Sequence, residues 1–194
     1  MGKIFYLMGK SASGKDSLYR MIRERTKDRL LPLVLYTTRP IRSGEAEGRE
    51  YYFTDEAHLA KLRAAGRIIE ERCYHTVHGP WYYFTADEGQ IDPVRSSYLG
   101  IGTLESYVKL KNYFGEEQLV PLYIETEDGL RLFRALERER RQKEPKYAEL
   151  CRRFLADQED FSEERLKKAG VSVRYENNGT AEACLEKLLR VIEG

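Results

Sequence analysis

The sequence predicts a mixed α/β fold, in which a mostly parallel sheet is flanked by helices and carries a small inserted lobe. Three observations predict it: an apolar run that leads through a glycine-rich turn into a helical pattern, strand-like segments that alternate with helical ones, and a tyrosine-rich stretch that follows neither pattern. Strands separated by helices favour a parallel sheet with right-handed crossovers. The 194 residues are enough for one such domain.

The individual elements follow from these patterns. The apolar run Ile4-Phe5-Tyr6-Leu7 predicts a first strand over 3–8, and similar segments predict strands over 33–36, 67–71, 98–101, 118–124 and 171–175. Helical patterns cover 15–25, 56–64, 103–113, 127–142, 147–168 and 180–192. The last helix has Thr180 as a suitable N-cap, after a turn at Asn178-Gly179. Short alternating stretches rich in tyrosine, within 44–85, predict a partly antiparallel lobe.

Composition excludes several classes of protein. A net charge of +1 with 34% charged residues indicates a mixed surface and gives no electrostatic case for nucleic-acid binding. No apolar run approaches the roughly 20 residues of a membrane span, and the N-terminus leads directly into a core strand, which leaves no room for a signal peptide. Cys73, Cys151 and Cys184 are scattered and lack metal-binding spacing. We therefore expect a cytoplasmic protein, monomeric or homodimeric, that binds neither nucleic acid nor membrane.

The glycine-rich turn has the pattern of a phosphate-binding P-loop. Residues 8–17 read M-G-K-S-A-S-G-K-D-S, in which Gly9, Gly14 and Lys15 form G-x-x-x-x-G-K between a strand and a helix. Glycines let the backbone N–H groups face one phosphate, and the helix adds its positive end. We expect ATP to bind to the loop residues Gly9, Lys10, Ser11, Ala12, Ser13, Gly14, Lys15, Asp16 and Ser17.

One position departs from this pattern. The residue after Lys15 is Asp16, where a Ser or Thr hydroxyl would ligate Mg²⁺. A carboxylate is itself a ligand for hard cations, so Asp16 is a candidate metal ligand. Its negative charge beside the ATP phosphates is tolerable only with a divalent cation between them, which predicts Mg²⁺ as the cofactor.

A second motif follows the predicted second strand. Residues 36–53 read Y-T-T-R-P-I-R-S-G-E-A-E-G-R-E-Y-Y-F. Arg39 and Arg42 lie three apart around a proline, where two guanidinium groups can grip one phosphate, and Tyr51 can add a hydroxyl donor. Together with the upstream P-loop, this order of residues closely resembles the nucleoside-monophosphate-binding segment of guanylate kinases.

The resemblance implies the reaction ATP + GMP giving ADP + GDP, on a P-loop NTPase-type fold of three parts. These would be a core over 1–36, 86–126 and 169–194, a nucleoside-monophosphate-binding lobe over 37–85, and a helical lid over 127–168. By position it implies that Arg39, Arg42 and Tyr51 hold the GMP phosphate. A second group would support them and contact the base: Glu45, which orients the first arginine, Glu70, which reads guanine, Tyr83, which contacts the phosphate, and Thr85, which contacts the base.

The resemblance also implies roles on the ATP side. Lid arginines would close over the triphosphate, and Arg138, Arg141 and Arg153 match best, so they join Lys15 as expected catalytic residues. Asn177 matches a position near the adenine. Catalysis would consist of positioning and charge neutralisation, with no covalent intermediate.

Three departures from the family pattern leave alternatives open. Gly100 and Gly102 stand where aspartates are expected, and Leu35 stands where a base-contacting hydroxyl is expected. Asp16 would compensate for the lost carboxylate at the metal. The altered base contacts permit a kinase of the same fold with another acceptor, such as another nucleoside monophosphate or a ribose bisphosphate, although Glu70 argues against it. A non-catalytic phosphate-binding module is the other alternative, and the intact loop argues against it.

Overall fold

A five-stranded parallel sheet forms the centre of the protein. The computed structural model describes residues 2–76 and 79–194. The strand order is β2 (Leu31–Pro32), β7 (Tyr98–Gly102), β1 (Ile4–Met8), β8 (Leu119–Glu125) and β9 (Arg174–Glu176), and every neighbouring pair runs parallel. The predicted α/β fold with a mostly parallel sheet is therefore confirmed.

Helices cover both faces of this sheet, and β1 shows why. Successive side chains of a strand point to opposite faces, and all five residues of β1 are buried. Ile4, Tyr6 and Met8 pack with α3 (Leu104–Phe114) and α6 (Glu163–Lys168). Phe5 and Leu7 pack with α1 (Lys15–Thr26) and α7 (Ala181–Glu193). A continuous apolar run is what a strand buried on both faces requires.

The inserted lobe has a sheet of its own. Its order is β4 (Tyr51–Phe53), β3 (Leu35–Thr37), β6 (Gly79–Ala86) and β5 (Ile68–Thr76), and α2 (Glu56–Ala64) packs on it. Strands β3 and β4 are parallel, whereas β6 is antiparallel to both β3 and β5. The small lobe core includes Tyr36, Leu59 and Phe84. The rings of Tyr36 and Phe84 are stacked, with their centroids 5.1 Å apart.

Two predicted elements differ in the structure. In the segment predicted as a strand over 33–36, residues 33 and 34 lie outside the strands, between β2 of the core sheet and β3 of the lobe. The lobe sheet therefore begins at Leu35, slightly before the predicted boundary. The helix predicted over 147–168 is α5 (Tyr147–Asp160) followed by α6, with the break at Phe161. The Phe161 ring is buried and stacks on Tyr123 at 5.6 Å, which turns the chain back to the core.

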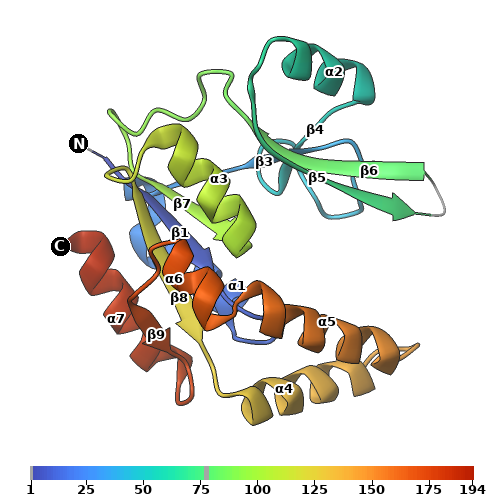
Figure 1. Ribbon diagram of the computed structural model, residues 1–194, viewed down its shortest axis with the longest axis vertical. Coiled ribbons are helices and arrows are strands. Elements are labelled where there is room, and N and C mark those ends of the chain that lie inside the picture. Colours follow the sequence, from blue (N-terminus) through green and yellow to red (C-terminus); the bar gives the residue numbers. More distant parts are fainter. Residues whose placement is uncertain (1, 77–78) are drawn as a thin grey trace.

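The lobe and the hairpin of α4 (Asp128–Arg140) and α5 project from the same side of the core sheet (Figure 1). The amino-terminal end of α1, where the P-loop ends, lies between them. Across the described part of the chain, no helix has the length and apolar character needed to cross a membrane.

Candidate functional site

The P-loop connects β1 to α1, and both of its motif glycines are required by the packing around them. A Cβ atom on Gly9 would lie 2.6 Å from the carbonyl oxygen of Ile124. Gly14 has φ of +89°, and a Cβ there would lie 2.4 Å from Asn177 Nδ2. Any side chain at either position would collide, and at Gly14 it would also be strained. The loop therefore follows the tight path of a phosphate-binding turn, in which successive backbone N–H groups can face one phosphate.

Side chains that follow the carboxyl ends of β8 and β9 donate hydrogen bonds to the P-loop. The carbonyl oxygen of Ser13 accepts hydrogen bonds from Asn177 Nδ2 at 2.8 Å and from Thr126 Oγ1 at 3.1 Å. Asn177 was expected near the adenine, but its side chain is buried beneath the loop. The next residue, Asn178, lines a neighbouring cavity of about 280 Å³ together with Lys10. The sequence could not separate these two adjacent asparagines.

Lys15 and Asp16 face a larger cavity between the core and the lobe. This cavity has a volume of about 930 Å³ and is lined by residues from α1, from strands β2 to β7 and from the loop 48–50. Lys15 Nζ lies 3.5 Å from Asp16 Oδ2, and the Asp16 side chain is 80% exposed. Within residues 2–76 and 79–194, no group of three or more His, Cys, Asp and Glu residues could hold a metal by itself. A single carboxylate beside a P-loop lysine does suit Mg²⁺, which proteins bind through one or two carboxylates plus the substrate phosphates.

The lobe forms a compact arginine site next to this cavity, which Tyr51 of the site lines. Arg39 is buried and makes a two-pronged ion pair with Glu45, at 2.8 Å and 2.6 Å. Its guanidinium also lies over the rings of Tyr51, at 5.1 Å, and Phe53, at 5.5 Å. Glu45 accepts a further hydrogen bond from the backbone N–H of Arg42 at 2.8 Å. The hydrogen bond from Arg39 lowers the pKa of Glu45 to about 2.

These contacts bring most of the predicted acceptor-phosphate residues together. Tyr51 and Tyr83 line the cavity, with their rings 5.5 Å apart, and the exposed Arg42 contacts Glu45 through its backbone N–H. Glu45 holds the first arginine, as the resemblance implied. That this group binds the phosphate of GMP stays a prediction.

Glu70 has a different environment from the one expected. Its side chain is 1% exposed, and its two carboxylate oxygens accept hydrogen bonds from Thr85 Oγ1 at 3.1 Å and Ser106 Oγ at 3.0 Å. Arg72 Nε lies 3.4 Å from Glu70 Oε2. Arg72 is among the described residues that line the cavity, whereas Glu70 and Thr85 are not. Both residues expected to contact the base are thus enclosed behind Arg72, a residue that motif reasoning did not single out.

Tyr6 explains the glycines that replace the expected aspartates. A Cβ on Gly100 would lie 2.6 Å from Tyr6 Cδ2, and a Cβ on Gly102 would lie 2.1 Å from Tyr6 Oη. Burial and the nearby charge of Glu70 raise the pKa of the Tyr6 hydroxyl, which hydrogen-bonds with Ser106. A neutral phenol from β1 therefore occupies the space beside β7.

The three predicted lid arginines are not all placed alike. Arg138 and Arg153 line a small cavity between α4 and α5, which Ser11 of the P-loop also lines. Arg141 is 79% exposed and lies 3.8 Å from Glu137 Oε2, away from the loop. The structure therefore groups Arg138 and Arg153 near the P-loop and separates Arg141 from them.

A buried arginine joins α4 to the P-loop, and sequence reasoning missed its role. The Arg131 side chain is 1% exposed, donates to the carbonyl oxygen of Ser11 at 3.0 Å, and pairs with Asp157 Oδ2 at 2.9 Å. The same Asp157 oxygen accepts from the backbone N–H of Ser11 at 2.7 Å. Arg131 belongs to a basic helix whose charges are typical of a solvated face, so only the contact with a loop 120 residues away distinguishes it.

Comparisons with known proteins agree with this geometry. The guanylate kinase family model matches residues 1–81. A guanylate kinase from Bordetella pertussis is 40% identical over 81 residues, which cover 42% of this chain and 36% of that protein. One from Mycoplasma pneumoniae is 40% identical over 74 residues, which cover 38% and 31% of the two chains. The predicted resemblance to guanylate kinases is confirmed over this amino-terminal part, which spans about a third of each relative.

The chain as a whole is similar in fold to a solved guanylate kinase. The crystal structure of a guanylate kinase from Anaplasma phagocytophilum superimposes with a TM-score of 0.61 and covers 99% of this chain and 85% of that one. The sequence identity of that superposition is 22%, so it shows the fold alone.

Proposed function

We propose that the protein is a kinase that transfers the γ-phosphoryl group of ATP to GMP, with Mg²⁺ as its cofactor. One observation carries the proposal: Lys15 of the P-loop and Tyr51 of the arginine site line the same cavity of about 930 Å³. A phosphate on the loop and a phosphate held by the lobe would therefore share one enclosed space. The match of residues 1–81 to guanylate kinases covers both halves of that cavity.

Catalysis would depend on position and charge. The Arg39–Glu45 pair fixes one guanidinium in place, so the acceptor phosphate would meet a donor whose orientation is already set. Lys15 would neutralise charge on the transferring phosphoryl group, and Arg138 and Arg153 would reach it from the lid. Mg²⁺ bound beside Asp16 would offset charge on the ATP phosphates. A phosphate oxygen of GMP is already a competent nucleophile, so no general base is required.

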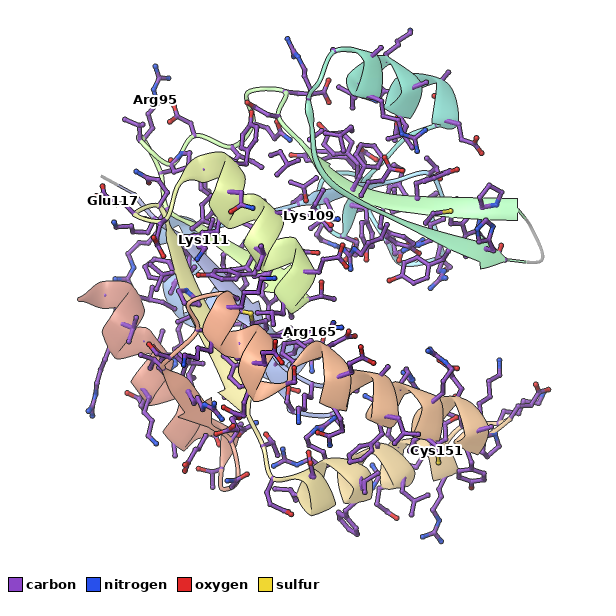
Figure 2. All side chains as sticks on the ribbon, in the orientation of Figure 1. Arg95, Lys109, Lys111, Glu117, Cys151 and Arg165 are labelled. Carbon is purple, nitrogen blue, oxygen red and sulfur yellow. The ribbon has the colours of Figure 1, made fainter. Side chains whose placement is uncertain are left out.

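The cysteines support a cytoplasmic location. All three are free, and Cys184 is buried, as in proteins that keep reduced thiols. Cys151 lies on α5 in the hairpin of the lid (Figure 2).

A coupled assay of ADP release tests the proposal directly. Turnover should require ATP, Mg²⁺ and GMP together, and Lys15→Ala should lower kcat about a hundredfold or more, the scale of removing one transition-state contact. Lys187→Ala is the matched control, because Lys187 is exposed on α7 and outside the cavity. Parent-like turnover of GMP by Lys15→Ala would refute the assignment of the loop. No ADP release with any phosphorylated acceptor would instead favour the non-catalytic module.

A further inference from the structure

The cavity presents a guanidinium group where a carboxylate was expected. Glu70, Arg72 and Tyr74 alternate along β5, so all three side chains point to one face of the lobe sheet. Arg72 and Tyr74 line the cavity. Glu70 lies deeper, and its charge faces Arg72 at 3.4 Å. The group that an acceptor in this cavity would meet is therefore a hydrogen-bond donor.

Glu70 has little capacity left for a ligand. Its two oxygens accept from Thr85 and Ser106, and Arg72 Nε lies 3.4 Å from one of them. A carboxylate that is 1% exposed cannot accept from a base in the cavity unless these partners move. The contacts instead suit a residue that fixes another one, because a buried charge paired with an arginine restrains that arginine.

Arg72 has donors to spare. Its Nε is buried and faces Glu70 Oε2 at 3.4 Å, which restrains the side chain and leaves the two terminal Nη groups as the donors for a ligand. The side chain is 22% exposed, toward a cavity whose other walls include the apolar residues Leu33, Leu35 and Ile101. Apolar side chains beside a restrained guanidinium suit an aromatic ring that carries two hydrogen-bond acceptors on one edge.

We propose that Arg72 is the specificity-determining residue for the acceptor base and that it binds O6 and N7 of a 6-oxopurine, with Glu70 as its positioning residue. This inference rests on the proposed function. Arginine pairs with these two atoms through two parallel N–H donors, whereas adenine has an amino donor in place of O6. The 2-amino group of guanine plays no part in this contact. The acceptor class is therefore 6-oxopurine nucleoside monophosphates, and it includes inosine monophosphate as well as GMP.

Base analogues test the inference on the unmodified protein. We expect kcat/KM for inosine monophosphate within about threefold of that for GMP, since the two share O6 and N7. AMP should be about 5- to 150-fold poorer, the range that one two-pronged arginine contact provides. 7-Deaza-GMP, which lacks the N7 acceptor, should be at least about tenfold poorer than GMP, the scale of one charged hydrogen bond.

Variants then assign the effect to residues. Arg72→Ala should raise KM for GMP and inosine monophosphate by the same factor, with kcat and the AMP reaction nearly unchanged. Arg95→Ala is the matched control, because Arg95 is 86% exposed, does not line the cavity, and lies at the upper left of Figure 2, away from the lobe. Glu70→Gln should also act equally on the two 6-oxopurines, because it loosens Arg72. If Glu70 read guanine directly, the Glu70→Gln substitution would raise KM for GMP more than KM for inosine monophosphate. A purely structural defect would slow the reaction with AMP as well.

The outcomes separate the two proposals. If GMP is phosphorylated but inosine monophosphate is more than about 30-fold poorer, Arg72 does not read the base, and the kinase assignment stands. Retention of the full preference for GMP over AMP in Arg72→Ala would overturn the inference in the same way. Failure of all purine monophosphates as acceptors would overturn both.

Discussion

A single methyl group at Gly102 should destabilise the protein, and Tyr6→Phe should relieve the effect. The Cβ of Gly102→Ala would lie 2.1 Å from Tyr6 Oη, well inside the roughly 3.5 Å at which non-bonded heavy atoms begin to attract. Tyr6 is 1% exposed and packed against α3, so its ring has no free space to enter. Gly102 does not have a positive φ, so alanine itself is compatible with the backbone.

The size of the effect follows from the type of collision. Overpacking a well-packed core costs about 1–3 kcal/mol in the free energy of unfolding. At about 2–4 °C per kcal/mol for a domain of this size, Gly102→Ala should lower Tm by about 2–12 °C. Tyr6→Phe alone removes one buried hydrogen bond and should cost about 0.5–1.5 kcal/mol. In the double variant the nearest ring atom would be Cζ at 3.1 Å, which a small shift accommodates. The double variant should therefore lose less than the sum of the two single variants.

Gly100→Ala provides the control within the same strand. Its Cβ would meet Tyr6 Cδ2 at 2.6 Å and Cε2 at 2.9 Å, ring carbons that phenylalanine retains. Tyr6→Phe should consequently rescue Gly102→Ala but not Gly100→Ala. Urea denaturation of the parent, the three single variants and the two double variants measures both coupling energies. Equal rescue at the two glycines, or a neutral Gly102→Ala, would refute the steric explanation.

Two further predictions concern charges at the ends of the cavity. The pKa of Glu45 is about 2 in the folded protein against an ordinary 4.5, so its pair with Arg39 stabilises the fold above about pH 4.5 and is lost as the pH falls toward 2. The stability difference between the parent and Glu45→Gln, from denaturation at several pH values, should be constant above pH 5 and shrink below 4.5; a difference independent of pH would contradict this assignment. Asp16→Ser should raise the Mg²⁺ concentration needed for half-maximal turnover, with partial rescue at high Mg²⁺, whereas identical Mg²⁺ titrations would leave Asp16 as a first-turn residue favoured by the helix dipole.

The sequence correctly predicted the elements whose first and last residues are determined by neighbouring residues, such as caps and glycine turns. The strand, glycine turn and helix around the P-loop were predicted because each depends on neighbouring residues. The helix over 56–64 was also predicted at its observed bounds, and the Asp55 side chain caps it by accepting from the backbone N–H of His58 at 2.7 Å. The division between β2 and β3 was missed, because an apolar run does not reveal which of two sheets each half joins.

In the candidate site too, contacts between residues close in sequence were predicted, and contacts between distant residues were not. Arg39, Glu45 and Tyr51 lie within 13 residues of one another, and the motif that contains them predicted the group that the structure forms. The environment of Glu70 depends instead on Ser106, 36 residues away, and on a salt bridge with Arg72 that strand alternation alone cannot establish. The resemblance singled out Glu70 as the residue that reads guanine, which stays a prediction, and only the packing revealed that other side chains enclose it.

The absent aspartates of β7 are best understood through charge at the base end of the cavity. An aspartate at Gly102 would collide with Tyr6 and would place a second carboxylate near Glu70, whose charge Arg72 already balances. The Tyr6 phenol fills the same space without charge, because burial and Glu70 keep its pKa high. Tyr6, Gly102, Glu70 and Arg72 therefore form one interdependent set. If Arg72 binds the base as proposed, a second carboxylate on β7 would compete with Glu70 for its guanidinium and draw it away from the base.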